Sequence, residues 1–262
     1  MHIGVHARLT AESIDVRELA RRAEELGFES LFVPEHTHIP ASFVAEHPDR
    51  AEWAGWAARL YDPFVVLAAA ATVTSELRLG TGVCLVPQHH PITLAKQVAT
   101  LDRLSNGRFL FGVGAGWVEG ELAHHGVTAR RRFRALRESL LAMQAIWTRE
   151  EATFDGELVH FDGVRQGPKP LQQPHPPILV GGEGERAQSI TRELGAEWFP
   201  HAGIELERGA GLRISIFDAE AQEDALERYA AAGVARCVLL LRSTKPGDAE
   251  RELERLAAFT TR

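Results

Sequence analysis

Residues 77–117 constrain the fold of this chain more than any other segment. They contain two apolar, β-branched runs, at 77–86 and 108–113, separated by an amphipathic stretch that begins at Pro91. A strand–helix–strand unit of this kind builds a parallel sheet. Because both runs lead into glycines, a flat ligand that carries phosphate can lie against bare backbone at that edge of the sheet. The segment therefore predicts a fold class and the edge of the sheet at which a ligand binds.

Strand-length and helix-length patterns alternate along the rest of the chain as well. The expected strands lie at 2–6, 30–34, 77–86, 108–113, 178–180, 197–200, 212–217 and 237–241. The expected helices lie at 11–26, 63–74, 91–104, 130–147, 185–194, 219–232 and 248–259. Eight strands with helices between them, and no break in composition, predict an α/β fold with a single (β/α)8 TIM barrel domain over residues 1–262. A doubly wound open sheet is the alternative.

Three segments depart from this regular alternation. Residues 35–62 form a long connection, which is typical of a lid or cofactor cover, with a surface excursion as the alternative. Residues 150–177 are interpreted as an insertion that carries a β-hairpin around Asp155-Gly156. Residues 201–211 are too few for a full helix with two turns, so one barrel helix is expected to be lost or shortened.

The charge balance argues against several classes of partner. The net charge is −7 and no basic patch dominates, which argues against nucleic acid and anionic membranes. The longest basic run, at 130–132, is expected to be solvated or ion-paired. The N-terminus lacks a signal-peptide pattern and no apolar run approaches the ~20 residues of a membrane span, so a cytoplasmic location is expected. Cys84 and Cys237 lie in apolar runs and are expected to be buried and unpaired.

The candidate catalytic residues follow the second strand, since working residues of a barrel lie at the C-terminal ends of its strands. His36 is the candidate for proton transfer because imidazole titrates near neutral pH. Glu35 beside it is expected to orient His36 or to act as an acid–base group itself. No metal site is expected, because adjacent pairs such as His124-His125 diverge and no spaced set of histidines and carboxylates occurs.

Two glycine-rich turns are the candidate ligand-binding loops. Residues 181–184 (GGEG) precede a helix, where free N–H groups attract phosphate, although Glu183 would repel it if the side chain turned inward. Residues 114–117 (GAGW) let the backbone approach a flat ligand, with tight packing as the alternative. Three tryptophans are expected on the substrate side of the site, or else in the core: Trp53, Trp56 and Trp117.

Five motifs spread along nearly the whole chain occur in the order of a known family. They are VPEH at 33–36, RLGTGV at 78–83, HPITLAKQVATLDRLSNGRFLFGVGAGW at 90–117, PPILVGG at 176–182 and ERYAAAGVARCVLLL at 227–241. With these motifs the chain resembles the bacterial luciferase-like superfamily of flavin- or deazaflavin-dependent oxidoreductases. The resemblance implies a (β/α)8 barrel that binds FMN or the deazaflavin coenzyme F420 at its C-terminal mouth, and often a homodimer through the helices beside strands three and four.

The resemblance also implies roles for individual residues. In the family, the histidine that matches His36 lies beside the cofactor ring, and the acidic residue that matches Glu35 is the neighbour of that histidine. The positions of Gly82 and Val83 run beneath the middle of the ring, and those of 181–184 hold the phosphate region. Together with the glycine-rich turns, this makes the candidate cofactor-binding residues Gly82, Val83, Ala115, Gly116, Gly181, Gly182, Glu183 and Gly184.

Two departures from the family pattern bear on function. Ala115 stands where flavin-using members carry a phosphate-gripping arginine, which favours F420 over FMN. Trp117 replaces the acid of some deazaflavin dehydrogenases, which argues against a sugar-phosphate substrate. The expected function is therefore F420-dependent hydride transfer between reduced deazaflavin and a small organic substrate. The alternatives are an FMN-dependent luciferase-like monooxygenase that uses O2 with a flavin or F420 reductase as partner, and a non-enzymatic barrel that binds a ligand or a partner.

Overall fold

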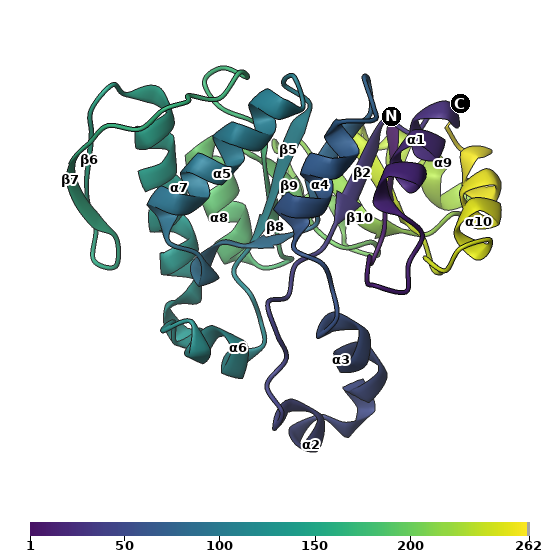
Figure 1. The fold of residues 1–262 in the computed structure, drawn as a ribbon, viewed down its shortest axis with the longest axis horizontal. Coiled ribbons are helices and arrows are strands. Elements are labelled where there is room, and N and C mark those ends of the chain that lie inside the picture. Colours follow the sequence, from purple (N-terminus) through teal and green to yellow (C-terminus); the bar gives the residue numbers. More distant parts are fainter. Residues whose placement is uncertain (261–262) are drawn as a thin grey trace.

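Eight parallel strands of the computed structural model, which describes residues 1–260 without the Arg208 side chain, form a nearly closed barrel (Figure 1). Around the barrel the strands follow the order β10-β11-β1-β2-β3-β5-β8-β9. Their bounds are β1 (His2–His6), β2 (Ser30–Val33), β3 (Arg78–Thr81), β5 (Phe109–Gly114), β8 (Ile178–Gly181), β9 (Glu197–Phe199), β10 (Ser215–Ala219) and β11 (Arg236–Leu240).

The two ends of this sheet meet between β9 and β10. The Trp198 N–H donates to the Arg213 carbonyl (2.8 Å), and the Phe217 N–H donates to the Pro200 carbonyl (2.8 Å). A doubly wound sheet has two free edges, whereas here the last strands bridge to each other. The predicted TIM barrel is therefore confirmed and the open-sheet alternative is wrong.

Helices cover the outside of the barrel between successive strands. The longer ones are α1 (Val16–Glu25), α4 (Pro63–Ala71), α5 (Pro91–Leu104), α7 (Arg132–Thr148), α8 (Glu185–Leu194), α9 (Glu223–Ala231) and α10 (Asp248–Ala257). Helix α1 begins five residues later than predicted, because the Asp15 carboxylate caps it by accepting the Arg17 N–H (2.8 Å). Between β9 and β10 there is only a 3-10 turn, η4 (Leu206–Gly209), so the predicted shortening of 201–211 is confirmed.

The predicted strand at 77–86 is divided in two. After β3 the chain passes through Gly82 and Val83, whose peptide bond is cis, before β4 (Cys84–Leu85) pairs with β5. Thr81 Oγ1 donates to the Gly112 carbonyl (2.6 Å), and the Gly82 N–H donates to the Val33 carbonyl (2.7 Å). The pairing of β2 with β3 therefore ends at Gly82, and the chain turns at Val83 before it pairs with β5.

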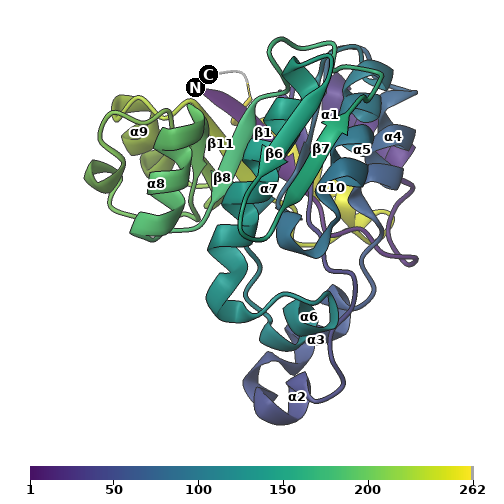
Figure 2. The same cartoon turned by 90° about the vertical axis from the view of Figure 1, so that its left-hand side faces the viewer.

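Short helices gather beyond the C-terminal ends of the strands. They are α2 (Phe43–Glu46), η1 (Pro48–Arg50), α3 (Ala51–Ala57) and α6 (Glu119–His124). Figures 1 and 2 both place α2, α3 and α6 on this one side of the barrel. Phe43, Ala54 and Val118 form a small apolar core there, with Ile39 and Trp53 packed against it. The connection at 35–62 thus packs on the loop after β5 rather than extending over the surface.

The insertion carries the expected hairpin. Strands β6 (Ala152–Asp155) and β7 (His160–Val164) are antiparallel and lie outside the barrel beside α7 (Figure 2). Glu138 of α7 accepts the N–H groups of Leu158 (2.7 Å) and Val159 (3.1 Å) at the turn. These bonds hold the hairpin away from the barrel mouth.

The barrel interior is filled by side chains from six of the strands. A cluster of Phe32, Leu110, Leu179, Phe199, Phe217 and Val238 occupies the centre, separate from the larger core between the strands and the helices. At the N-terminal end, Arg236 is buried against Glu29 and Glu197. A hollow of about 470 Å³ lies beside them, lined by Arg78, Leu110, Ile178, Glu197 and Arg236. The residues predicted for the site lie at the opposite, C-terminal end of the strands.

Candidate active site

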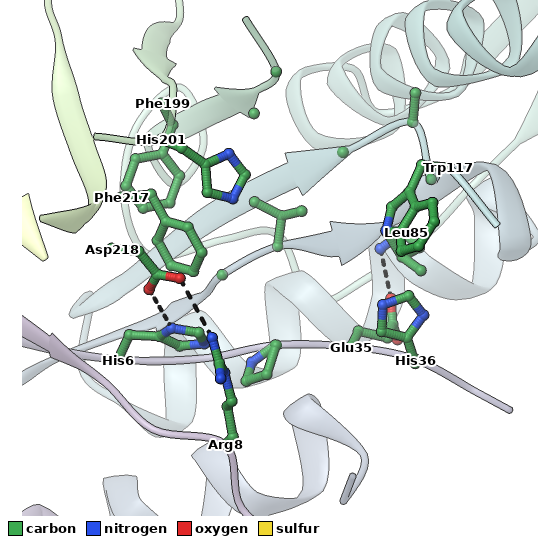
Figure 3. A pocket seen from close by; sticks show the side chains of 18 of the residues that line it. His6, Arg8, Glu35, His36, Leu85, Trp117, Phe199, His201, Phe217 and Asp218 are labelled. Carbon is green, nitrogen blue, oxygen red and sulfur yellow. Dashed lines mark hydrogen bonds and ion pairs between the residues drawn. The ribbon is translucent and has the colours of Figure 1, made fainter. Parts of the chain in front are cut away.

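A cavity of about 360 Å³ opens at the C-terminal ends of the barrel strands. All the predicted site residues line this cavity except two, Glu183 and Gly184. Figure 3 shows its two polar ends, one around His36 and Glu35 and the other around His6 and Asp218. Concave sites at this face of a TIM barrel are where ligands bind.

The first polar end is built on His36, which follows β2. His36 Nδ1 lies 2.8 Å from Glu121 Oε2, and Glu121 of α6 is fully buried. The other Glu121 oxygen accepts the Thr37 N–H (2.9 Å). Burial alone would raise the pKa of Glu121, but the hydrogen bonds from His36 and Thr37 lower it below its usual range. An ionised Glu121 therefore holds His36 with its Nδ1 protonated.

Glu35 is buried behind His36 and is already engaged by the protein. One oxygen accepts the Leu85 N–H (2.6 Å), as Figure 3 shows, and the other lies 3.0 Å from His89 Nε2. Burial lowers the pKa of His89, but the bond to Glu35 outweighs this and raises it. Burial, with Glu35 close by, raises the pKa of the Cys84 thiol well above its ordinary value.

Glu35, Cys84 and His89 are also a set of three possible metal ligands, with atoms within 4.8 Å of one another. Both Glu35 oxygens and the His89 Nε2 already bond within the protein. The high pKa of Cys84 opposes the thiolate that a metal needs. Both cysteines are free and buried, as predicted.

The second polar end was not found by sequence reasoning. His6, the last residue of β1, places Nδ1 2.7 Å from Asp218 Oδ1 in β10. Arg8 lies 3.6 Å from the other Asp218 oxygen, as Figure 3 shows. Burial raises the pKa of Asp218, but the neighbouring His6, which is hydrogen-bonded to it, and the charge of Arg8 outweigh this effect and lower that pKa. The only sequence signal was that His6 ends a strand, as residues of a barrel site do.

The aromatic wall of the cavity comes from the lid and from the loop after β5. The Trp53 ring lies edge-on to His36, 5.1 Å between centroids, and 4.8 Å from Trp117. Trp117 remains 43% exposed, so a ligand can reach it. Trp56 lies beneath the Arg8 guanidinium, 4.4 Å from its ring centroid. All three predicted tryptophans thus face the cavity, and Trp53 is at the same time part of the lid core.

Bare backbone forms the floor of the cavity, but its glycines also serve packing. A Cβ on Gly82 would lie 2.8 Å from the Phe217 ring, and one on Gly114 would lie 2.7 Å from Val83. Gly182 has a φ of +113°, which favours glycine. Tight packing, one of the two interpretations left open for residues 114–117, therefore holds at Gly114, while ligand approach to this wall stays a prediction.

The mouth beside α8 carries positive charge. Arg132, the first residue of α7, lines the cavity, and both Arg132 and Arg186 lie over the Phe133 ring, at 5.2 Å and 5.8 Å. Arg131 of the same basic run pairs at the surface with Glu157 (3.3 Å), as expected of a solvated or ion-paired run. The half-buried Arg132 also faces the cavity, which the sequence analysis did not predict, because the turn at η3 (Ala129–Arg131) brings α7 to the mouth.

Residues 183 and 184 lie just beyond the cavity. Glu183 is half exposed, and its carboxylate lies 3.5 Å from His201 Nδ1. Gly184 precedes the first turn of α8 and has open space around its Cα. The free N–H groups of this helix start lie at the mouth, next to Gly181 and Gly182 of the cavity wall.

A model of the luciferase-like monooxygenase family matches residues 2–260. An uncharacterized protein of Mycobacterium tuberculosis is 39% identical across 98% of both chains. The FMNH(2)-dependent dimethylsulfone monooxygenase of Pseudomonas putida is 27% identical over 79% of this chain and 52% of that protein. An F420-dependent glucose-6-phosphate dehydrogenase of Amycolatopsis mediterranei is 32% identical over 64% of this chain and 47% of that protein.

Solved structures agree on the fold. The monooxygenase RslO1 from Streptomyces bottropensis superposes with a TM-score of 0.77 over 98% of both chains, at 22% identity. The coenzyme F420 dependent tetrahydromethanopterin reductase from Methanopyrus kandleri does so with a TM-score of 0.70 over 98% of both, at 16% identity. No helix within residues 1–260 is both long and apolar enough to cross a bilayer.

Proposed function

Since this chain belongs to the luciferase-like monooxygenase family, we propose that it is an F420-dependent oxidoreductase that transfers a hydride between reduced deazaflavin and a small organic substrate. Members of the family are oxidoreductases that work with flavin-type cofactors, and relatives of this chain are named for FMN and for F420. The choice of F420, the substrate and the role of each residue are the proposal.

The cavity fits a flat ring. Its lining includes the backbone of Gly82, Gly114, Gly116 and Gly181 and the small side chain of Val83, so a planar molecule can lie close to this wall. Arg132 and the start of α8 lie at the mouth, where the anionic tail of either cofactor is attracted.

One observation carries the choice of F420. Ala115 lines the cavity after β5 and is buried, so this position offers only a methyl group to a phosphate. The resemblance places a phosphate-gripping arginine here in flavin-using members. A tail that reaches farther toward Arg132 and α8 suits this mouth better than a phosphate held at residue 115.

The protein groups then have separate tasks. When bound, the deazaflavin supplies the hydride chemistry. His36, held by Glu121, stabilises or protonates the charge that develops beside the ring. Glu35 fixes the backbone at Leu85 and so supports the floor. Trp53, Trp56 and Trp117 exclude water from the substrate side and favour an apolar or aromatic substrate.

An FMN-dependent monooxygenase is the second candidate function. Arg132 supports it, because a guanidinium at the mouth can bind the single phosphate of FMN. Such an enzyme needs O2 and a partner reductase, and one relative is named as the oxygenase component of a trigonelline monooxygenase.

A side-by-side titration tests the proposal. The fluorescence of oxidised F420 and of FMN is followed as each is mixed with the pure protein. We expect F420 to bind at least about tenfold more tightly, the effect of one good charge-assisted hydrogen bond that FMN lacks. Tighter FMN binding supports the monooxygenase instead. Binding of neither contradicts both and supports a barrel that only binds another ligand or a partner.

A further inference from the structure

The buried pair of His6 and Asp218 forms an end of the cavity that the proposed function does not use. The two residues come from β1 and β10, which are separated in the barrel by β11. The His6 side chain is 3% exposed and that of Asp218 is 22% exposed. Both line the cavity, opposite the end that holds His36 (Figure 3).

The hydrogen bond between the two residues determines the state of the imidazole. An ionised carboxylate only accepts, so the Nδ1 of His6 carries the hydrogen that Asp218 receives. In the neutral ring Nε2 then holds a free lone pair. This Nε2 is buried and has no partner among the residues that the structure describes. Buried polar atoms are nearly always paired, so a bound molecule is the natural partner for this one.

One cation and one carboxylate face this end. Arg8 lies 3.6 Å from Asp218 and over Trp56. The Arg8 Nε, like His6 Nε2, is buried and has no partner among the described residues. His201, which follows β9, lies 3.5 Å from Glu183, and the His36–Glu121 pair lies at the opposite end. Arg8 and Asp218 therefore give the end around His6 no net charge.

The walls around His6 are apolar rings. The Phe217 ring centroid lies 4.5 Å from that of His6, and Phe199 lies 5.1 Å from Phe217. An acceptor at His6 Nε2, with the unpaired donor Arg8 Nε lining the same cavity, matches a flat molecule that carries a hydroxyl group, since a hydroxyl both donates and accepts. Such a molecule donates its O–H hydrogen to Nε2 and packs its apolar part on the rings.

We propose that His6 is a second acid–base residue of this cavity, positioned by Asp218, and that it binds the hydroxyl group of an alcohol substrate with a cyclic or aromatic body. This inference rests on the proposed function. When bound, the oxidised deazaflavin would accept the hydride from the alcohol carbon, and His6 Nε2 would accept the O–H proton as the C=O bond forms. In the reverse direction the His6 imidazolium returns the proton to the carbonyl oxygen.

The experiment uses 4-nitrophenol as a probe, without cofactor, because its absorbance distinguishes the phenol from the phenolate. The wild type, His6→Asn and Asp218→Asn are titrated between about pH 5 and 9, where both the probe and histidine ionise. The asparagine at position 6 keeps a donor for Asp218 but lacks Nε2. His160→Asn is the matched control, since His160 and Asp155 form a pair of the same kind (2.8 Å) on the exposed hairpin.

We expect the wild type to bind the probe and to shift its ionisation to lower pH, as a base that accepts the proton does. Affinity falls by about tenfold in His6→Asn, the effect of one hydrogen bond, and by a smaller factor in Asp218→Asn. His160→Asn matches the wild type. No binding to the wild type, or equal binding to His6→Asn, overturns the inference.

Two further measurements separate this inference from the proposed function. F420 titration of His6→Asn should match the wild type within about threefold, a change smaller than the loss of one hydrogen bond. Loss of F420 binding together with displacement of the probe by F420 would assign His6 to the cofactor and overturn the inference. If the wild type itself binds no F420, the proposed function fails while the probe result stands. Should His6→Asn not fold, the ¹⁵N resonance of His6 Nε2 in the wild type must move toward its protonated position when the probe is added.

Discussion

Two histidines of the cavity are each held by a carboxylate that is remote in the chain. His36 is paired with Glu121 across 85 residues, and His6 with Asp218 across 212 residues. In each pair the carboxylate is ionised and receives the Nδ1 hydrogen, which leaves Nε2 for a ligand. The geometry thus offers two proton sites at opposite ends of one apolar cavity.

The proposed role of His36 predicts that His36→Ala leaves the protein folded and lowers turnover by about 10²- to 10⁴-fold, the usual contribution of a general acid or base. The cofactor dissociation constant should stay nearly the same, because the glycine floor and the mouth still bind the ring and tail. The rate of cofactor reduction or oxidation at saturating substrate measures the effect.

Glu121→Gln is the companion variant. It keeps an acceptor for His36 but removes the charge, so the loss should be smaller than for His36→Ala, and the pH profile of turnover should move to lower pH. Unchanged turnover in His36→Ala would remove His36 from the mechanism.

His89 predicts a pH dependence of stability. Its pKa is raised above the ordinary value of 6.5 in the folded protein, because the bond to Glu35 outweighs the effect of burial. Protonated His89 therefore stabilises the fold below the ordinary pKa, and this stabilisation is lost as pH rises through the raised value. The variant His89→Gln should lack this pH-dependent stabilisation.

Urea unfolding at about pH 6 and 9 measures this change. The wild type should lose more free energy of unfolding between the two pH values than His89→Gln does, by about 1 kcal/mol. Equal losses would mean that the ion pair of His89 and Glu35 does not form in solution.

At the scale of the elements, ion pairs and a hydrogen bond join residues of β9, β10 and β11 and the residue before β2 at the N-terminal end of the barrel. Arg236 of β11 binds Glu29, just before β2 (2.7 and 2.8 Å), and Glu197 of β9 (3.3 Å), while Ser215 of β10 donates to Glu197. Arg236 is 1% exposed. This end of a TIM barrel serves stability, since the loops that bind ligands lie at the other end.

We expect Arg236→Met to lower the free energy of unfolding by about 1–3 kcal/mol, because Glu197 and the partly buried Glu29 lose a buried cation and keep only Arg213 (2.8 Å) and Arg78 (3.9 Å) as partners. Urea denaturation followed by tryptophan fluorescence measures it. Arg228→Met is the matched control: Arg228 pairs with Asp224 on the exposed face of α9 (3.1 Å), and its loss should change stability by at most about 0.5 kcal/mol. A similar small effect at Arg236 would contradict the structural role.

At the scale of the whole molecule, two helices beside β3 leave apolar side chains in solvent. Val65 of α4 is 68% exposed and Leu104 at the end of α5 is 63% exposed. The family resemblance places a dimer contact at these helices, and exposed apolar side chains are typical of such contacts. We therefore propose a homodimer across α4 and α5.

Sedimentation velocity tests the dimer. The wild type should sediment as a dimer and Val65→Glu as a monomer, since a buried unpaired carboxylate opposes association. Val44→Glu is the control, because Val44 is also exposed (40%) but lies on α2 at the mouth. A monomeric wild type would contradict the proposal. That residues 1–262 form a single domain also stays a prediction.

Much of the barrel was predictable because the signals for it are local. Strand runs, the proline that opens α5 and the glycines after strands all lie within a few residues of the elements they define. The positions at which a strand is interrupted or a helix begins were harder to predict. The division of β3 from β4 and the late start of α1 depend on contacts with other segments, such as the bond from the Gly82 N–H to Val33 and the Asp15 cap.

The sequence by itself determined the family, the barrel and the loops that carry the site, since periodicity and short motifs are properties of neighbouring residues. Only the tertiary structure decided which groups work in pairs. Asp218 and Arg132 line the cavity and Glu121 binds His36 behind it, because parallel strands bring their C-terminal ends to one face, whatever the distance along the chain. A carboxylate 212 residues from its histidine leaves no local trace, and its role becomes visible only when the barrel closes.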